Sequence, residues 1–177
     1  MKVSHAISAS VDLPLSCREA VAFVQSVRSL SRVRFMQNLQ VSPQADGISQ
    51  RLRAEIPVDV PLLGHYDLTF ASELVPTARG ASLQALPVSG RKGWAEVSGE
   101  AEVAALPGGS RVRYLLAVTL HVDLPEPERW GGRALLKMVE LTAQRVVADI
   151  TAEFPKAVEA AAADAEGVLS GAYVGKR

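Results

Sequence analysis

The feature that most constrains the fold is a long stretch of helical periodicity at residues 126–163. Its apolar positions recur every three or four residues, so they form one stripe on an α-helix: Leu135, Val139, Ala143, Val146, Ile150, Phe154 and Val158. A helix with one apolar face of this length needs a large apolar surface to cover it. Pro155 lies inside the pattern, so we expect a kink or an early end of the helix there.

The segments before this helix alternate as strands do and can supply that surface. Residues 2–12 alternate apolar and polar side chains, which predicts a half-buried first strand. Ser16 and Glu19 have the spacing of a capping box, which predicts a helical segment from Ser16 to about residue 32, broken into two short helices near Ser29 or Ser31.

From residue 34 to residue 122 the period is two, which predicts six further strands. Pro57 falls within one of them and indicates an edge position or a bulge, because proline cannot donate to a ladder. The sixth strand of the chain has an acidic outer side and an inner side that includes small residues. A hairpin with the seventh strand predicts two cross-strand pairs, Glu102 with Arg111 and Glu100 with Arg113.

The order of these elements resembles that of the START/Bet v 1-like superfamily, also called SRPBCC or helix-grip proteins. The resemblance covers residues 2–163 and rests on the helical pair after the first strand, the terminal helix, and the hairpin around Leu106-Pro107-Gly108-Gly109-Ser110. Within the superfamily the chain looks most like the polyketide cyclase branch and the group of G-type subunits of carbon monoxide dehydrogenase, as a member of an uncharacterised bacterial family.

The resemblance implies an α+β helix-grip fold, in which a curved antiparallel sheet of about seven strands wraps around the C-terminal helix. It implies one domain at residues 1–163, followed by a flexible tail at residues 164–177. Such a sheet and helix often leave a mostly apolar cavity between them. Small inner residues would leave room for it, but they would equally let the helix pack closely over a filled core. Both alternatives remain open on the sequence.

The side chains expected to line such a cavity lie on the inner face of the strands, at the start of the helix and on its apolar stripe. They are His5, Tyr66, Phe70, Val97, Gly99, Tyr114, Leu116, Val118, Trp130, Val139 and Ala143.

Several of these candidates have a second, structural interpretation. His5 on the inner face is either a hydrogen-bonded core residue or a ligand contact. Tyr66 and Tyr114 either orient a ligand or end at the rim of the sheet. Trp130 either borders the cavity mouth or anchors the start of the helix. Trp94 is expected to face outward, where it would mark a contact surface.

Composition argues against several classes of function. Lys plus Arg and Asp plus Glu number 19 each, so the chain lacks the excess of positive charge that nucleic-acid binding requires. Zero net charge makes a homodimer or a protein partner plausible. We expect neither a transmembrane segment nor a signal peptide, and hence a cytoplasmic protein. Cys17 is the single cysteine, and the three histidines do not converge, so we expect neither a metal nor another cofactor.

Three functions follow as hypotheses. The first is a binding protein, rather than an enzyme, for a small hydrophobic or lipid-like ligand held between the sheet and the helix. The second is an enzyme of the polyketide cyclase or dehydratase type, which would need several polar groups inside the cavity. The third is an adaptor or assembly factor for a partner enzyme or a membrane, which the resemblance to the G-type subunits of carbon monoxide dehydrogenase implies.

Overall fold

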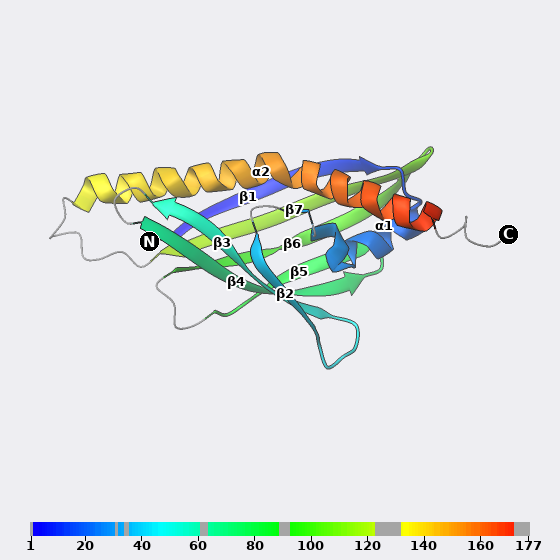
Figure 1. Ribbon diagram of the computed structural model, residues 1–177, viewed down its shortest axis with the longest axis horizontal. Coiled ribbons are helices and arrows are strands. Elements are labelled where there is room, and N and C mark those ends of the chain that lie inside the picture. Colours follow the sequence, from blue (N-terminus) through cyan, green and yellow to red (C-terminus); the bar gives the residue numbers. More distant parts are fainter. Residues whose placement is uncertain are drawn as a thin grey trace.

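The computed structural model describes residues 2–30, 32–33, 36–60, 64–88, 93–122 and 132–171 (Figure 1). The strands are β1 (Lys2–Leu13), β2 (Gln37–Pro43), β3 (Gln50–Val60), β4 (Gly64–Thr77), β5 (Gly80–Leu86), β6 (Gly93–Leu106) and β7 (Gly109–Val122). The helices are α1 (Cys17–Val24), a 3₁₀ turn η1 (Val27–Leu30), and α2 (Gly132–Gly171).

The seven strands form one sheet in the order β1-β7-β6-β5-β4-β3-β2, and each pair of neighbours runs antiparallel. Beyond the short strand β5, β4 meets β6 directly at Thr69 and Trp94. The sheet curves, and α2 lies along it against β1 and β3, with α1 near its C-terminal end (Figure 1). The prediction of an α+β helix-grip fold, with a curved antiparallel sheet around a C-terminal helix, is confirmed.

The capping box that opens α1 forms as predicted. The Ser16 hydroxyl accepts from the Glu19 amide at 3.4 Å, and the Glu19 carboxylate accepts from the Ser16 amide at 2.9 Å and from its hydroxyl at 2.6 Å. These bonds to the charged form lower the pKa of Glu19. The break in the helical segment comes after Val24, earlier than predicted.

The apolar stripe of α2 faces the sheet. Val139, Ala143, Ile150, Phe154 and Val158 are all buried. The stripe also includes Val147, which is 1% exposed, whereas the predicted neighbour Val146 is only partly buried. The side chain of Leu135 and residues 126–131 of the predicted helix lie outside the described part of the chain.

Of the two outcomes expected at Pro155, the early end is wrong, because α2 continues to Gly171, and the kink stays a prediction. Proline removes one helical hydrogen bond. Buried apolar side chains on both sides of it, from Phe154 to Ala161, belong to one core cluster with residues of the sheet and of α1, and their burial offsets that loss. Residues 164–171 of the predicted tail are therefore helical, while residues 172–177 are not described. The flexibility of the tail stays a prediction.

The register predicted between β6 and β7 is wrong by two residues, and so are the charge pairs predicted from it. The strands meet in a tight turn in which Leu106 pairs with Gly109, and Gly108 adopts φ +82°. This register sets Glu102 opposite Arg113 and Glu100 opposite Leu115.

Arg111, one of the arginines in those predicted pairs, contacts β1 instead. Its guanidinium donates to both carboxylate oxygens of Asp12, at 2.6 and 2.8 Å, and this pairing lowers the pKa of Asp12. The ion pair therefore supports the register of β1 against β7.

Pro57 sits where the sheet has a free edge among the described residues. The described pairing of β2 with β3 reaches only Glu55, and Pro57 lies beyond it, opposite Asp67 of β4. A proline is tolerated at such an edge because one side of the strand has no ladder that needs its missing N–H. No helix in the described ranges is both long and apolar enough to cross a membrane.

Candidate functional site

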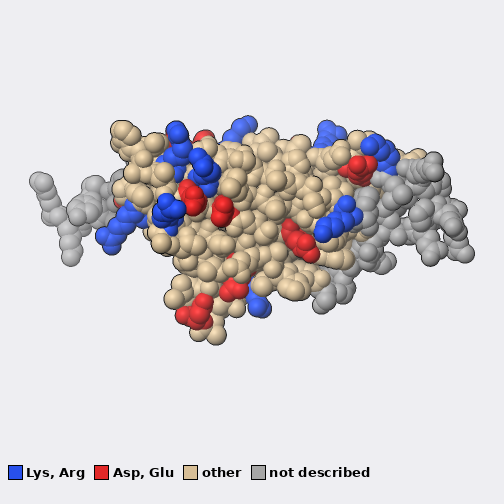
Figure 2. Space-filling model, turned by 180° about the vertical axis from the view of Figure 1, so that it is seen from behind, with Lys and Arg blue, Asp and Glu red and all other residues tan. Residues whose placement is uncertain are grey.

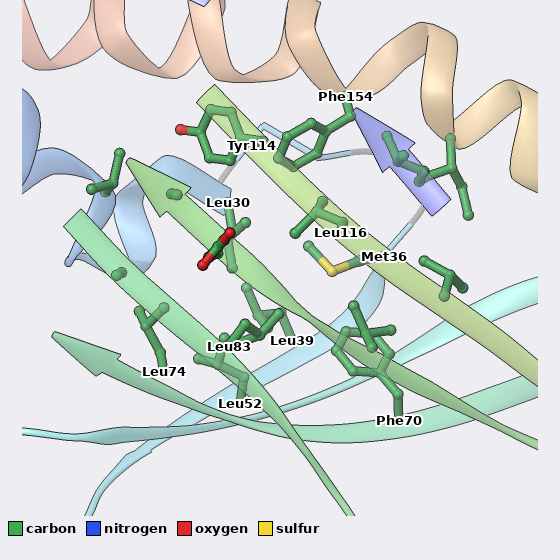
Figure 3. A pocket seen from close by; sticks show the side chains of 18 of the residues that line it. Leu30, Met36, Leu39, Leu52, Phe70, Leu74, Leu83, Tyr114, Leu116 and Phe154 are labelled. Carbon is green, nitrogen blue, oxygen red and sulfur yellow. The ribbon is translucent and has the colours of Figure 1, made fainter. Parts of the chain in front are cut away.

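An apolar cavity of about 90 Å³ lies between the inner face of the sheet, the η1 turn and the middle of α2 (Figure 3). Its walls come from β1 to β7, α1, η1, α2 and the segment before β2. The lining residues are Ile7, Val24, Leu30, Met36, Leu39, Leu52, Ile56, Phe70, Leu74, Ala81, Leu83, Val97, Glu100, Ala101, Tyr114, Leu116, Val118, Ile150 and Phe154.

Small side chains of the sheet form part of the cavity wall. Ala81 of β5 and Ala101 of β6 are paired neighbours on the inner face, and both line the cavity together with Phe154 of α2. Two adjacent alanines leave a hollow that the phenylalanine ring does not fill. The sequence interpretation that small residues of β6 leave room therefore fits Ala101.

Gly99 has a different role from the predicted one. It is absent from the cavity lining, and a Cβ on it would lie 2.2 Å from the carbonyl oxygen of Leu115. The glycine is required because β6 and β7 approach closely there, at a φ of +156°. Ala95, the other small residue of the strand, is fully buried where the core is filled.

Five of the predicted candidates come together at the cavity: Phe70, Val97, Tyr114, Leu116 and Val118. They belong to three strands of the sheet, and their alternation in the sequence was sufficient to find them. Whether they contact a ligand stays a prediction.

The other predicted candidates lie elsewhere. Val139 and Ala143 are buried, but they pack in the filled part of the core, and Tyr66 is partly buried at its border. His5 alternates with Val3 and Ile7 on the edge strand β1, yet it is exposed. Trp130 lies outside the described residues.

Most of the lining residues that were not predicted as candidates lie on the regular strands and helices, and three come from an irregular wall of the cavity. Leu30 ends η1, while Met36 and Leu39 flank the start of β2. The pairing of β2 with β3 shifts between Gln37 and Gln40, so no regular period marks these residues. Ile150 and Phe154 were on the predicted helix stripe, and a fuller use of that stripe would have found them.

Tyr114 is the one lining residue with a buried hydroxyl. The residue is 6% exposed, and its ring meets that of Phe154 edge to face at 5.0 Å. Its hydroxyl oxygen is buried and has no hydrogen-bond partner among the described residues. Burial raises the pKa of Tyr114, so the hydroxyl is neutral at physiological pH. Figure 3 shows this hydroxyl on the side of the ring that faces away from Phe154.

Glu100 is the only charged residue in the described lining. It is exposed, and it also borders a shallow depression near the β4–β5 turn, with Arg79 and Glu102. The described lining includes no lysine, arginine or histidine. The cavity is therefore apolar, with one neutral hydroxyl and one acidic residue.

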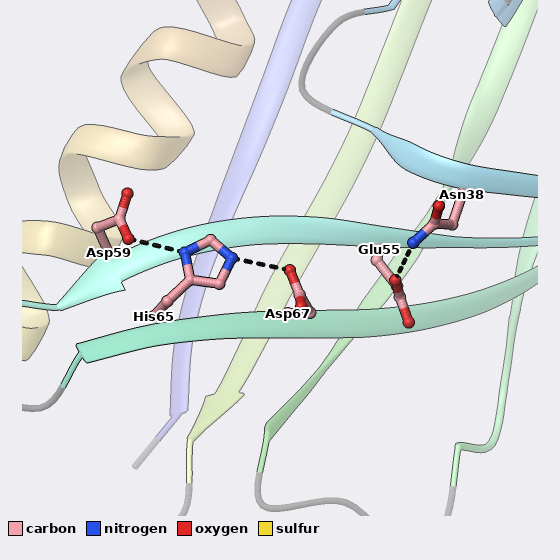
Figure 4. A network of polar contacts seen from close by, with 5 residues as sticks. All are labelled: Asn38, Glu55, Asp59, His65 and Asp67. Carbon is pink, nitrogen blue, oxygen red and sulfur yellow. Dashed lines mark hydrogen bonds and ion pairs between the residues drawn. The ribbon is translucent and has the colours of Figure 1, made fainter.

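Other polar contacts lie away from the cavity. His65 lies between two carboxylates, with Nδ1 2.7 Å from Asp59 and Nε2 3.1 Å from Asp67, and both raise its pKa (Figure 4). All three residues are exposed. No group of three or more metal-ligating side chains gathers in the described ranges.

The outer face of the sheet has its own small aromatic contact. Trp94 stacks on His121 with ring centroids 4.6 Å apart, and both residues are partly buried. His121 Nε2 lies 3.3 Å from the Glu96 carboxylate, which suits an ion pair when the ring is protonated, although no hydrogen bond is aligned there. Figure 2, seen from behind, shows charges of both signs scattered around a broad uncharged centre.

A protein-family model described as "Protein of unknown function (DUF3809)" matches residues 8–152. The chain belongs to the DUF3809 family. No curated protein sequence matches this DUF3809 chain.

Solved structures resemble this DUF3809 chain in fold. One is the Zhui aromatase/cyclase from Streptomyces sp. R1128, with a TM-score of 0.52, 16% identity, and coverage of 88% of this chain and 94% of that one. Another is the di-domain ARO/CYC StfQ from the steffimycin biosynthetic pathway, with a TM-score of 0.57, 11% identity, and coverage of 93% and 52%.

A third is the di-domain ARO/CYC BexL from the BE-7585A biosynthetic pathway, with a TM-score of 0.52, 13% identity, and coverage of 88% and 50%. The chain thus spans about half the length of the two di-domain proteins. At these identities the likeness establishes a shared fold and nothing about a reaction.

Proposed function

We propose that this chain binds a small hydrophobic or lipid-like ligand in the cavity between the sheet and α2. The observation that carries the proposal is the lining itself, which is apolar apart from Tyr114 and Glu100. Burial of apolar ligand surface there would drive binding by about 25 cal/mol per Å². A lining of this kind, with few polar groups, is typical of small-molecule sites.

The size of the cavity sets a condition on binding. A volume of about 90 Å³ is well below the roughly 300–1,000 Å³ typical of ligand pockets. A ligand therefore enters by displacing side chains of the wall. The irregular wall of Leu30, Met36 and Leu39 is the part best suited to move, because Met is unbranched and flexible and because this wall lacks regular sheet pairing at its start.

The enzyme hypothesis has less support from the site. A cyclase or dehydratase needs several polar groups around the substrate, and the described lining offers one hydroxyl and one carboxylate residue. The aromatase/cyclases named above share the fold, and the fold alone does not transfer their activity. The adaptor role, a homodimer or protein partner and a cytoplasmic location stay predictions.

Native mass spectrometry of the gently purified protein tests the proposal, together with calorimetric titration of decanol. We expect a bound hydrophobic molecule or uptake of decanol. Ala101→Leu, which fills the cavity from β6, should weaken decanol binding at least tenfold. Ala104→Leu is the matched control, because Ala104 lies on the same strand but is exposed and lines no part of the cavity.

Two results would contradict the proposal. One is the mass of the bare chain combined with no heat of decanol binding to the wild type. The other is equal decanol affinity in Ala101→Leu and Ala104→Leu, which would place the binding outside the cavity.

A further inference from the structure

We infer that the cavity selects an uncharged ligand that carries one hydrogen-bonding oxygen, and that the Tyr114 hydroxyl is the group that recognises it. The inference rests on the proposed function and names the ligand class. It starts from the hydroxyl of Tyr114, which is buried and lacks a partner among the described residues. A buried hydroxyl without a partner is costly in free energy, so a ligand that supplies the missing bond regains it.

The surroundings of Tyr114 favour a neutral partner over a charged one. Transfer of a carboxylate into an apolar cavity is costly unless a cation or several donors compensate it. The described lining offers no cation, and its one charged residue, Glu100, is itself acidic. A fatty acid in its ionised form is thus a poor ligand for this site.

A cationic head group at Tyr114 is also disfavoured, because the one carboxylate of the described lining, that of Glu100, is exposed. Glu100 is exposed, whereas Tyr114 is 6% exposed and packs edge to face on Phe154. An ammonium at Tyr114 would lose its water without an opposite charge beside it. An alcohol, ketone or ester oxygen needs only the single bond that Tyr114 can make, as donor or as acceptor.

Four probes with the same ring and different head groups test this inference: toluene, benzyl alcohol, benzoate and benzylamine. Binding to the wild type and to Tyr114→Phe is followed by methyl NMR titration at neutral pH. We expect the wild type to bind benzyl alcohol at least tenfold more tightly than benzoate or benzylamine. Tyr114→Phe should weaken benzyl alcohol about five- to tenfold and leave toluene within about twofold. Because this variant removes only the unpartnered hydroxyl, thermal unfolding should show that it remains folded.

The outcomes separate this inference from the proposed function. Equal effects of Tyr114→Phe on toluene and benzyl alcohol, or tightest binding of benzoate or benzylamine, would overturn the inference and leave a hydrophobic cavity site in place. If the wild type binds neither toluene nor benzyl alcohol, and decanol does not bind either, the proposed function is overturned and the inference with it.

Discussion

The core between the sheet and α2 has a filled half and a half that contains the cavity, and the two halves are packed differently. In the filled half, large residues of the sheet, such as Leu68 and Leu120, meet Val139 and Ala143 of α2, and no lining residue of the cavity lies among these four. In the cavity half, the small Ala101 of the sheet and the large Phe154 of the helix line the same cavity. The small partner is on the helix in the first case and on the sheet in the second.

That difference explains where the cavity remains. An alanine on the helix lets the whole helix approach the sheet, so its neighbours close around it. At Ala101 of the sheet a hollow remains, because the backbone of β6 is held in register by β5 and β7 and cannot move inward alone. Position along the strand also matters, because Ala95 of the same strand is fully covered in the filled half.

The largest expected effect on stability comes from truncating one leucine in each half. Leu68→Ala in the filled half should lower the free energy of unfolding by about 3 kcal/mol, within the range for fully buried leucines. Leu83→Ala in the cavity wall should cost less than about 2 kcal/mol, because Leu83 is only partly buried and already borders empty space. Urea denaturation measures both. A larger loss for Leu83→Ala would reverse the assignment of the two halves.

The opposite change, from small to large, sharpens the same comparison. Ala95→Leu should destabilise by about 1–3 kcal/mol, because Ala95 is 0% exposed in the filled half. Ala101→Leu, on the same strand and the same face, should change stability by less than about 1 kcal/mol, because the added methyl groups enter the cavity. If both variants lose the same stability in thermal unfolding, the hollow beside Ala101 is not available to a side chain.

A smaller effect is expected from the cap of α1, which borders the cavity half. Ser16→Ala removes the hydroxyl of the capping box and should cost about 1 kcal/mol. Hydrogen exchange should become faster in α1, whereas the amides of β3 and β4 beside Leu68 keep their protection. Uniform loss of protection in both regions would mean that the two halves unfold as one unit.

The smallest expected effect is the dependence of stability on pH that His65 causes at the surface of the filled half. The folded pKa of His65 lies above its ordinary value of 6.5, because Asp59 and Asp67 stabilise the protonated ring. This contribution to stability is therefore fully present below about pH 6.5 and is lost as the pH rises through the folded pKa. In an NMR titration, Asp59→Asn should lower the pKa of His65. An unchanged pKa would remove Asp59 as the principal cause.

The sequence was sufficient to predict the regular parts of this molecule. Alternation and the helical stripe predicted the strands, α2 and the buried positions Ile150 and Phe154. The sequence did not reveal the irregular wall, because Met36 and Leu39 flank a shifted register that has no period. His5 was misplaced for a related reason, since alternation gives the face of a residue but not whether another element covers it.

The central claim is that a hydrophobic ligand binds in the cavity half and leaves the filled half unchanged. Methyl NMR titration with decanol tests it most directly, because both halves carry methyl groups that report separately. We predict saturable shifts at Leu83, Leu116 and Ile150, which line the cavity, and little change at Leu68, Leu120 and Val139. Saturable shifts at the second set without the first, or no saturable shift at any of the six, would contradict the account.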